Sequence, residues 1–323
     1  MSDGNMNKSS AIPYSRGYCL SLSDGSHWWI TSDDHEAEWL DKFASILELK
    51  ECAMNGSPKL VFIEMVDTED KDPTLSKLRS WGYSNAGWTC YDDNTLRVWW
   101  HNNIPDVICE IKDLGSDDEK QNMDIAYINM WTALHPIFQR SITNGGLPFH
   151  AGLAELEGRS ILIAAPGDTG KSTSCQRLPD YWNPLCDDEV LVTLTKQKQY
   201  RAHPFPTWSN YLWRRTEETW NVHYSVPLAA IFFLNQAETD EVVPLGAGEA
   251  AILISESAIQ VCRKFWRKTD KVDERKYKRQ IFDNACEMTK IIPAFQLYAT
   301  LHGKFWEEIE KALGCEERKN NGR

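Results

Sequence analysis

Residues His150 to Val190 read HAGLAELEGRSILIAAPGDTGKSTSCQRLPDYWNPLCDDEV. The first two apolar runs of this stretch, HAGLAEL and RSILIAA, flank Glu157 and Gly158, a pattern that predicts an antiparallel β-hairpin. The second strand leads into APGDTGKS, and the residues KSTSCQRL at its end are compatible with a helix. The stretch therefore predicts a hairpin, a glycine-containing loop and a helix, in that order.

The segment APGDTGKS nearly matches the pattern of a phosphate-binding P-loop. In that pattern glycines let backbone N–H groups turn toward phosphate oxygens, a lysine reaches the outer phosphates, and a serine or threonine binds Mg2+. Ala165 replaces the first glycine, which mainly permits a tight exit from the strand, so the change is modest. The flanking strand and helix favour nucleotide binding, whereas a turn rich in glycine and proline that needs no ligand is the alternative. The predicted phosphate-binding residues are Gly167, Asp168, Thr169, Gly170, Lys171, Ser172 and Thr173.

The acidic segment LCDDEV follows Lys171 after a gap that fits one short helix and a loop. We therefore expect its strand to lie beside the predicted P-loop strand in a parallel βαβ unit. Asp187 and Asp188 would then face the phosphates. There, one carboxylate can hold Mg2+ together with Ser172, and the other can accept a proton from an attacking hydroxyl. A solvated acidic turn, or an aspartate that caps a helix, is the alternative.

Four more residues in or near this stretch are candidates. His150 stands at the start of the hairpin, where a lone histidine is more often structural than catalytic. Arg201 and His203 follow the strand after the acidic pair, where a cation could offset charge on a transferring phosphoryl group. An arginine at a strand edge and a structural histidine fit the sequence equally well. Trp208, after an extended proline-containing segment, is a candidate wall for a peptide or an adenine ring.

The composition is that of a globular protein with room for two domains. The chain has 323 residues, and domains average roughly 150 residues. Its net charge of -12 argues against nonspecific binding to nucleic acid, which depends on Lys and Arg neutralising phosphates. No window resembles a signal peptide or a membrane span, so we expect a cytoplasmic protein without a membrane partner. The nine cysteines lack a CxxC motif or a Cys/His cluster, and we expect reduced thiols and no zinc site.

Apolar patterns divide the chain into two parts. A smaller N-terminal α/β or α+β domain is predicted over residues 1–115. Its strands are expected around the turn Asp24-Gly25 and in KLVFIEMV, GWTCYD, TLRVWWHN and DVICEIKD, and its helices in HEAEWLDKFASILEL and, as a short helix, in DPTLSKLRSWG. A linking helix over 116–146 begins with Asp117 and Asp118, which suit the positive end of the helix dipole.

The second domain is predicted over residues 147–313 and is followed by a polar tail, 314–323. Its further strands are expected in EVLVTLTK, QYRAHPF, AAIFFLNQ and AFQLYATLHG, and its helices in GEAAILISESAIQVCRKFWRK and GKFWEEIEKAL. The basic run from Arg263 to Arg279 is the solvated face of a helix in the simplest interpretation. A docking surface for an acidic leader peptide or a partner enzyme, in which Lys276 and Lys278 take part, is the alternative.

The stretch as a whole resembles a known family. It is similar to the catalytic domain of HPr kinase/phosphorylase, a bacterial protein-serine kinase. The shared features are a histidine followed by a small residue, a hairpin, a P-loop, and an Asp-Asp pair soon after the P-loop lysine. Within that wider group, the chain resembles the SynChlorMet cassette protein in the segments HPFPTWSNY, AAIFFLNQ and FQLYATLHGKFWEEIEKAL. That protein is encoded beside radical-SAM enzymes and a small peptide. Related members in lasso-peptide clusters phosphorylate a serine of a precursor peptide.

The resemblance implies an HPr-kinase-like P-loop domain, a mixed sheet with flanking helices, that uses ATP and Mg2+. The chain departs from the family at Cys186 and Ala151, neither of which should prevent catalysis. We find no counterpart of the glycine-rich, arginine-bearing segment linked to phosphorolysis, so we expect neither the reverse reaction nor control through HPr. By position, the resemblance implies that Lys171 and the amides of residues 167–173 hold the ATP phosphates. It implies that Ser172 and Asp188 bind the metal. It also implies that Asp187 is the general base and that His150 lies beside the transferred phosphate.

We therefore expect an ATP-dependent serine kinase whose acceptor is a hydroxyl of a ribosomally made peptide or small protein. Radical-SAM peptide-modifying enzymes are the expected partners, and a homo-oligomer is compatible with the sequence. One alternative is a noncatalytic ATP-binding module that recruits or regulates a peptide-modifying enzyme. The other is an ATPase that drives a conformational change.

Overall fold

The computed structural model describes residues 16–54, 56, 58–65, 76, 78–79, 81–84, 86–92, 95–112, 118–167, 169–214, 216–266 and 271–314. Four predicted features lie wholly or largely outside these residues: Asp117, Asp168, most of the DPTLSKLRSWG helix and the tail after Gly314. The chain divides into two compact units. Unit 1 contains Met1–Leu20, His27–Ser45 and Lys50–Ala133, and unit 2 contains Ser21–Ser26, Ile46–Leu49 and Leu134–Arg323.

Unit 1 is built on a seven-stranded mixed sheet with the order β3-β1-β2-β4-β7-β6-β5. Its strands are β1 (Gly17–Ser21), β2 (His27–Ser32), β3 (Lys50–Glu51), β4 (Lys59–Glu64), β5 (Trp88–Asp92), β6 (Leu96–His101) and β7 (Val107–Ile111). Strands β2, β4 and β7 are parallel, whereas β3, β5 and β6 run antiparallel to their neighbours. The predicted strands are confirmed, and β3 is a short addition that the sequence pattern did not indicate.

Two helices belong to unit 1, α1 (Ala37–Ile46) and α3 (Glu119–Ala133). The ring of Phe43 on α1 lies 5.5 Å from that of Phe62 on β4, edge to face, and both side chains are fully buried. Aromatic pairs of this kind add to the free energy gained by burying apolar surface. At the start of α3, the Asp118 carboxylate accepts a hydrogen bond from the backbone N–H of Lys120 at 3.0 Å. Asp118 therefore lies at the helix N-terminus, as its position in the sequence predicts.

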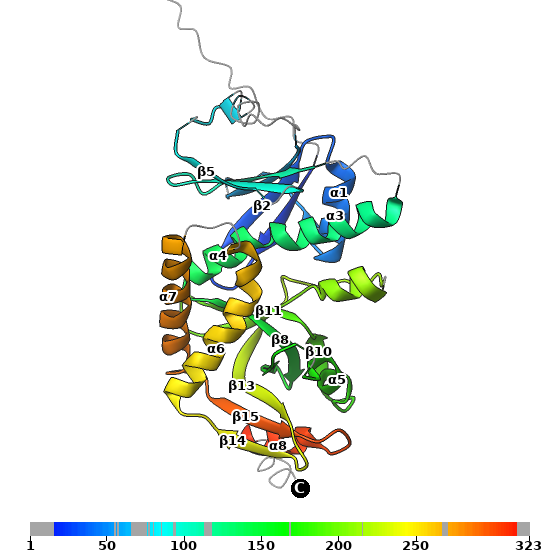
Figure 1. Cartoon of the computed structure of the whole chain (residues 1–323), viewed down its shortest axis with the longest axis vertical. Helices are drawn as coiled ribbons and strands as arrows, with labels where there is room; N and C mark the ends of the chain where they lie inside the picture. The colour runs from blue at the N-terminus through cyan, green and yellow to red at the C-terminus, as the bar shows by residue number, and fades with distance from the viewer. Residues whose placement is uncertain are drawn as a thin grey trace, which may run out of the picture. The chain divides into compact units, whose positions relative to one another are not determined.

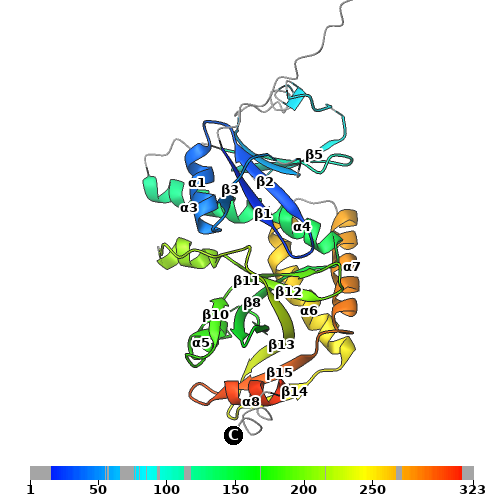
Figure 2. The same ribbon diagram turned by 180° about the vertical axis from the view of Figure 1, so that it is seen from behind.

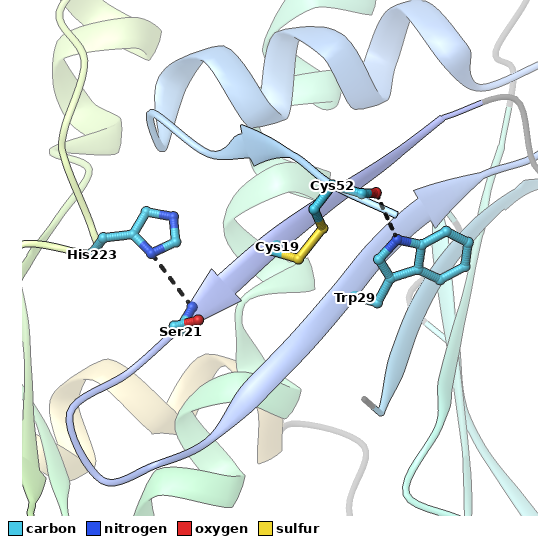
Figure 3. The surroundings of a disulfide bond; sticks show 5 residues. All are labelled: Cys19, Ser21, Trp29, Cys52 and His223. Atoms are coloured by element: carbon cyan, nitrogen blue, oxygen red, sulfur yellow. Dashed lines mark hydrogen bonds between the residues drawn. A yellow bond between two sulfur atoms is a disulfide. The ribbon is translucent and has the colours of Figure 1, made fainter. Parts of the chain in front are cut away.

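One disulfide corrects the expectation that all cysteines are reduced. Cys19 on β1 and Cys52, directly after β3, are bonded to each other, because these two strands are adjacent and antiparallel (Figure 3). The indole N–H of Trp29 donates to the carbonyl of Cys52 at 3.3 Å beside the bond (Figure 3). The sequence separation of 33 residues carries no signal for this pairing, since it arises only when the sheet forms. The other described cysteines are free thiols.

Unit 2 contains an eight-stranded mixed sheet with the order β10-β8-β11-β12-β13-β15-β14, and β9 pairs with both β8 and β13. Strand β9 is parallel to β13, which is parallel to β15, and the other pairs are antiparallel. The strands are β8 (Leu147–Leu156), β9 (Arg159–Ala164), β10 (Asn183–Cys186), β11 (Glu189–Leu194), β12 (Tyr200–Phe205), β13 (Val226–Gln236), β14 (Glu241–Pro244) and β15 (Ala294–Ala299). All strands predicted for this part of the chain are present, and β10 and β14 are additional.

The predicted hairpin is confirmed, but the predicted position of the acidic strand is wrong. Strands β8 and β9 pair antiparallel around Glu157 and Gly158, which both have positive φ. We expected the strand of LCDDEV beside β9, yet β10 and β11 both pair with β8. Because β8 and β13 occupy the two edges of β9, the acidic segment is separated from β9 by one strand. It still runs in the same direction as β9, since both are antiparallel to β8.

The predicted linking helix is two helices. Helix α3 ends at Ala133, and α4 (His135–Thr143) begins after Leu134, with Pro136 in its first turn. Proline has no N–H to donate, and its ring clashes with the carbonyl four residues earlier, so a continuous helix cannot pass through Pro136 undisturbed. The first helix belongs to unit 1 and the second to unit 2.

The helices of unit 2 pack on its sheet (Figures 1 and 2). Helices α6 (Ala247–Cys262) and α7 (Lys271–Met288) lie side by side, and α6 contacts β8 and β15. Helices α5 (Lys171–Gln176) and α8 (Phe305–Ala312) share a buried apolar cluster with β9, β13 and β15. Two short helical segments, η1 (Asn210–Arg214) and η2 (Arg263–Trp266), complete the unit. No helix in the described part of the chain is long and apolar enough to cross a membrane.

The basic run is divided between two environments. On α7, Lys276, Lys278 and Arg279 are exposed, as expected for a solvated helix face. Lys264, in η2, instead has only 21% of its side chain exposed and forms an ion pair with Glu189 at 3.3 Å. The solvated-face interpretation therefore holds for α7 and fails for Lys264. The docking alternative stays a prediction.

Candidate functional site

The loop between β9 and α5, residues 165–170, has the strand and helix context that the sequence predicts. It turns into α5 at Gly170, whose φ of 102° lies in the left-handed region that glycine adopts without strain. Helix α5 is short, since only Lys171–Gln176 are helical. Gly167 is exposed, and Asp168 lies outside the described residues.

Lys171 is held against this loop. Its side-chain ammonium donates to the carbonyl of Ala165 at 3.0 Å and to that of Pro166 at 3.2 Å, and the residue is 6% exposed. A buried ammonium needs such acceptors, because an unpaired charge is costly to bury. The contacts fix the lysine at the loop, where an anion bound to the loop amides would be within reach of the same ammonium.

Gly152 allows α5 to approach the sheet. It lies on β8, and a Cβ atom built there would be 2.3 Å from the Sγ atom of Cys175 on α5. Cys175 is 3% exposed, so its thiol has little room to turn away. The absence of a side chain at this position therefore sets the distance between β8 and the helix that carries Lys171 and Ser172.

Asp187 lies in the connection between β10 and β11 and shares a pocket with Ser172. The hydroxyl of Thr207 donates to its carboxylate at 2.5 Å, a charge-assisted hydrogen bond that orients the side chain. The pocket has a volume of about 340 Å³ and brings the first helical turn of α5 together with the carboxyl end of β10 and with η1. Its lining includes Ser172, Cys175, Asp187, Asn210, Arg214 and Glu218.

Asp188, the second carboxylate, pairs with His150. The Nε2 atom of His150 and an oxygen of Asp188 are 3.0 Å apart, so Nε2 carries the proton that it donates. The Nδ1 atom of His150 is buried and makes no hydrogen bond within the described residues. Neither residue lines the pocket of Ser172 and Asp187. The two neighbouring aspartates therefore have different partners, and the metal role predicted for Asp188 stays a prediction.

Lys264 and Glu189 form a second buried pair near Asp188. Burial lowers the pKa of Lys264 to about 8, and the nearby carboxylates of Glu189 and Asp188 oppose that shift. Glu189 is 3% exposed and directly follows Asp188. Its charge is balanced by the lysine, which keeps the start of β11 from carrying an uncompensated carboxylate.

A second pocket lies on another side of the β9–α5 loop and has a volume of about 460 Å³. Thr169, Gly170 and Thr173 line it together with the ends of β13 and β15. The side-chain amide of Gln236 donates to the carbonyl of Thr169 at 3.2 Å, which ties the loop to β13. Residues of the predicted P-loop thus face two pockets, with Ser172 in one and Thr169, Gly170 and Thr173 in the other.

The structure places Arg201 and His203 in structural roles. Arg201 donates to the hydroxyl of Ser225 at 2.9 Å. His203 is 1% exposed, and its Nδ1 atom lies 2.9 Å from the carbonyl of Val222 while its Nε2 atom accepts from the backbone N–H of Ser23 at 3.2 Å. An acceptor at Nε2 requires the neutral ring, and burial accordingly lowers the pKa of His203 to about 4.

Trp208 is completely buried and so does not form an exposed wall. Other residues of the same segment lie at the pocket. Thr207, which binds Asp187, and Arg214, which lines the pocket, come from the same loop as Trp208. Their roles depend on how that loop folds back, and spacing alone does not show this.

Among the described residues, no group of three or more His, Cys, Asp and Glu side chains is arranged to hold a metal ion. The protein is an α/β protein with mixed sheets and flanking helices, and its second unit places a glycine-containing loop beside an aspartate. Residues 107–314 match the family of the SynChlorMet cassette protein ScmC, and the chain belongs to that family. The match begins at β7 and covers the whole described part of unit 2 after Leu134. No curated protein matches the chain.

Proposed function

We propose that this protein is an ATP-dependent kinase with an HPr-kinase-like P-loop domain, and that it transfers the γ-phosphate to a serine hydroxyl of a ribosomally made peptide or small protein. The observation that carries the proposal is the pocket shared by Ser172 and Asp187, directly beside the loop that holds Lys171. Phosphoryl transfer requires positioning and charge neutralisation, and these side chains are the types that supply them.

Each residue has a definite task in this proposal. The loop amides and the Lys171 ammonium bind the phosphates. Asp187, oriented by Thr207, accepts the proton of the attacking hydroxyl, which must lie within hydrogen-bond distance of the carboxylate. The pocket next to Asp187 receives the acceptor side chain, and the pocket of about 460 Å³ beside Thr169 and Thr173 receives the nucleoside.

The donor set also fits Mg2+. A serine hydroxyl and a carboxylate in one pocket are hard oxygen ligands of the kind that this ion prefers. Ser172 and Asp187 are therefore the side chains that would hold it, in place of the Ser172 and Asp188 pair expected from the sequence. When bound, Mg2+ would neutralise charge on the phosphate oxygens.

Isothermal titration of MgATP tests the binding half of the proposal. Wild-type protein should bind, and Lys171→Ala should bind about 10- to 100-fold more weakly, the equivalent of one hydrogen bond to a charged group. Lys290→Ala is the matched control, because Lys290 is exposed and pairs only with the exposed Glu287 among the described residues. Equal affinity of the Lys171→Ala and wild-type proteins would contradict the proposed role of the loop.

A noncatalytic ATP-binding module is the second candidate, and one observation favours it: Asp188 and His150 bond to each other and not to the pocket of Ser172. Asp187→Asn separates the two functions, since only a kinase needs the carboxylate for transfer. Loss of phosphate transfer, with unchanged affinity for ATP measured without Mg2+, supports the kinase. Phosphate release at an unchanged rate, with no acceptor present, supports an ATPase.

A further inference from the structure

The pocket of Ser172 and Asp187 contains a cation that the sequence reasoning did not find. Arg214, the last residue of η1, lines this pocket together with both of them. Its side chain is exposed, and it forms no ion pair with any residue in the described part of the chain. Since Arg214 lines this pocket with two carboxylates and has no ion-pair partner among the described residues, its guanidinium is available to a ligand.

The other cations close to this region have partners. The Arg177 guanidinium, on the side of the second pocket, donates to the carbonyls of Thr300 at 2.8 Å and Gly303 at 2.5 Å. Arg201 bonds to Ser225, and Lys264 pairs with Glu189. Lys171 is held by the loop carbonyls. Arg214 differs from all of them in its exposure and in the pocket that it lines.

The loop that carries Arg214 also orients Asp187. Thr207, at its start, bonds to the Asp187 carboxylate. The loop closes on itself, because the side-chain amide of Asn210 donates to the Glu218 carboxylate at 2.7 Å and the hydroxyl of Tyr211 donates to the Glu218 carbonyl. Tyr211 is 1% exposed and anchors the loop in the protein. One loop thus carries both Thr207, which orients the aspartate, and Arg214, at the end of η1.

We propose that Arg214 is a catalytic residue that contacts the transferring phosphoryl group; this role rests on the proposed kinase function. In the step, the acceptor oxygen forms a bond to the γ-phosphorus while the bond to the β–γ bridging oxygen breaks, and ADP leaves. The hydroxyl proton passes to the Asp187 carboxylate. Negative charge on the phosphoryl oxygens lies close to that carboxylate, and a guanidinium with several N–H donors offsets it.

The complex of ADP with aluminium fluoride, which mimics the transferring phosphoryl group, tests this role without a peptide. In the presence of Mg2+, Arg214→Ala should lower the affinity for ADP–aluminium fluoride by about 1000-fold, the lower end of what such an arginine contributes. Its affinity for ADP alone should stay at the wild-type value. Arg214→Lys should recover part of the loss, because it restores the charge without the planar fork.

Arg279→Ala is the control, since Arg279 is 85% exposed on α7. Circular dichroism and urea unfolding establish that each variant is folded. If Arg214→Ala binds ADP–aluminium fluoride as tightly as wild-type protein does, the role of Arg214 is wrong and the proposed function stands. If wild-type protein does not bind ADP at all, the proposed function is wrong, and the role of Arg214 falls with it.

Discussion

Gly152→Ala tests the link between the sheet and the helix of the candidate site. The new methyl group would lie 2.3 Å from the Cys175 thiol, whereas non-bonded atoms rest about 3.5 to 4 Å apart. The contact can be relieved only by a movement of more than about 1 Å. Because the thiol is buried, this movement falls on α5. Overpacking of this size costs about 1 to 3 kcal/mol in the free energy of unfolding.

The same movement displaces Lys171 and Ser172 from Asp187. A misplacement of about 1 Å can lower the rate of a positioned reaction about 100-fold, so phosphate transfer should fall by that factor if the proposed function is right. Stability is measured by urea unfolding of four proteins: wild type, Gly152→Ala, Cys175→Ala and the double variant. Such a cycle isolates the interaction between the two positions.

The double variant should regain most of the stability that Gly152→Ala loses, because Cys175→Ala removes the atom in contact. Gly248→Ala is the control. Gly248 lies in α6 with no atom within 4 Å of its would-be Cβ, so alanine there should stabilise the protein by up to about 1 kcal/mol. Additive losses from Gly152→Ala and Cys175→Ala would refute the packing argument, since they would show that the two positions do not interact.

Three further predictions concern stability. Burial lowers the pKa of His203 to about 4, below its unfolded value of about 6.5, so the free energy of unfolding that the neutral ring contributes is complete above pH 6.5 and falls by about 3 kcal/mol as the pH drops to 4. Urea unfolding of His203→Gln should lack this pH dependence. A variant with the same pH profile as wild-type protein would contradict this role of His203. Lys264→Met removes the ammonium that pairs with the buried Glu189 and should lower the free energy of unfolding by about 3 to 5 kcal/mol. Adding Glu189→Gln should restore most of this loss. No recovery in the double variant would argue against the ion pair. Cys52→Ser should lower the free energy of unfolding by about 3 kcal/mol when it is compared with unreduced wild-type protein, and by little when both proteins are reduced. Reactive thiols at Cys19 and Cys52 in the native wild-type protein would contradict the disulfide.

Much of the fold follows from local sequence signals. The turn at Glu157 and Gly158, between two apolar runs, defines the β8–β9 hairpin, and the loop before Lys171 falls where the pattern puts it. These features depend on residues close together in the chain. Strand order is different, because it depends on which edges of a sheet are free. The sequence could not show that β8 would separate β9 from β10 and β11.

In the candidate site, too, residue types and spacing could be predicted from the sequence, whereas tertiary contacts could not. Ser172 and Asp187 were identified from their types and spacing, and the structure puts them in one pocket. The contact between Asp188 and His150 was not predicted, because neighbouring residues in a bend have different partners. Arg214 could not be found, because its position depends on how the loop after β12 closes through Asn210 and Glu218. Contacts made by tertiary folding are the part that spacing does not predict.

The proposed function requires transfer of the γ-phosphate to a peptide hydroxyl. It is tested by mass spectrometry of serine-containing candidate peptides, beginning with any small peptide encoded beside the gene, after incubation with the protein, Mg2+ and ATP labelled with ¹⁸O in its γ-phosphate. If the proposed function is right, one peptide gains a labelled phosphate on a serine with wild-type protein, and Lys171→Ala and Asp187→Asn abolish the gain. If every peptide stays unmodified while wild-type protein binds MgATP, the kinase assignment is wrong.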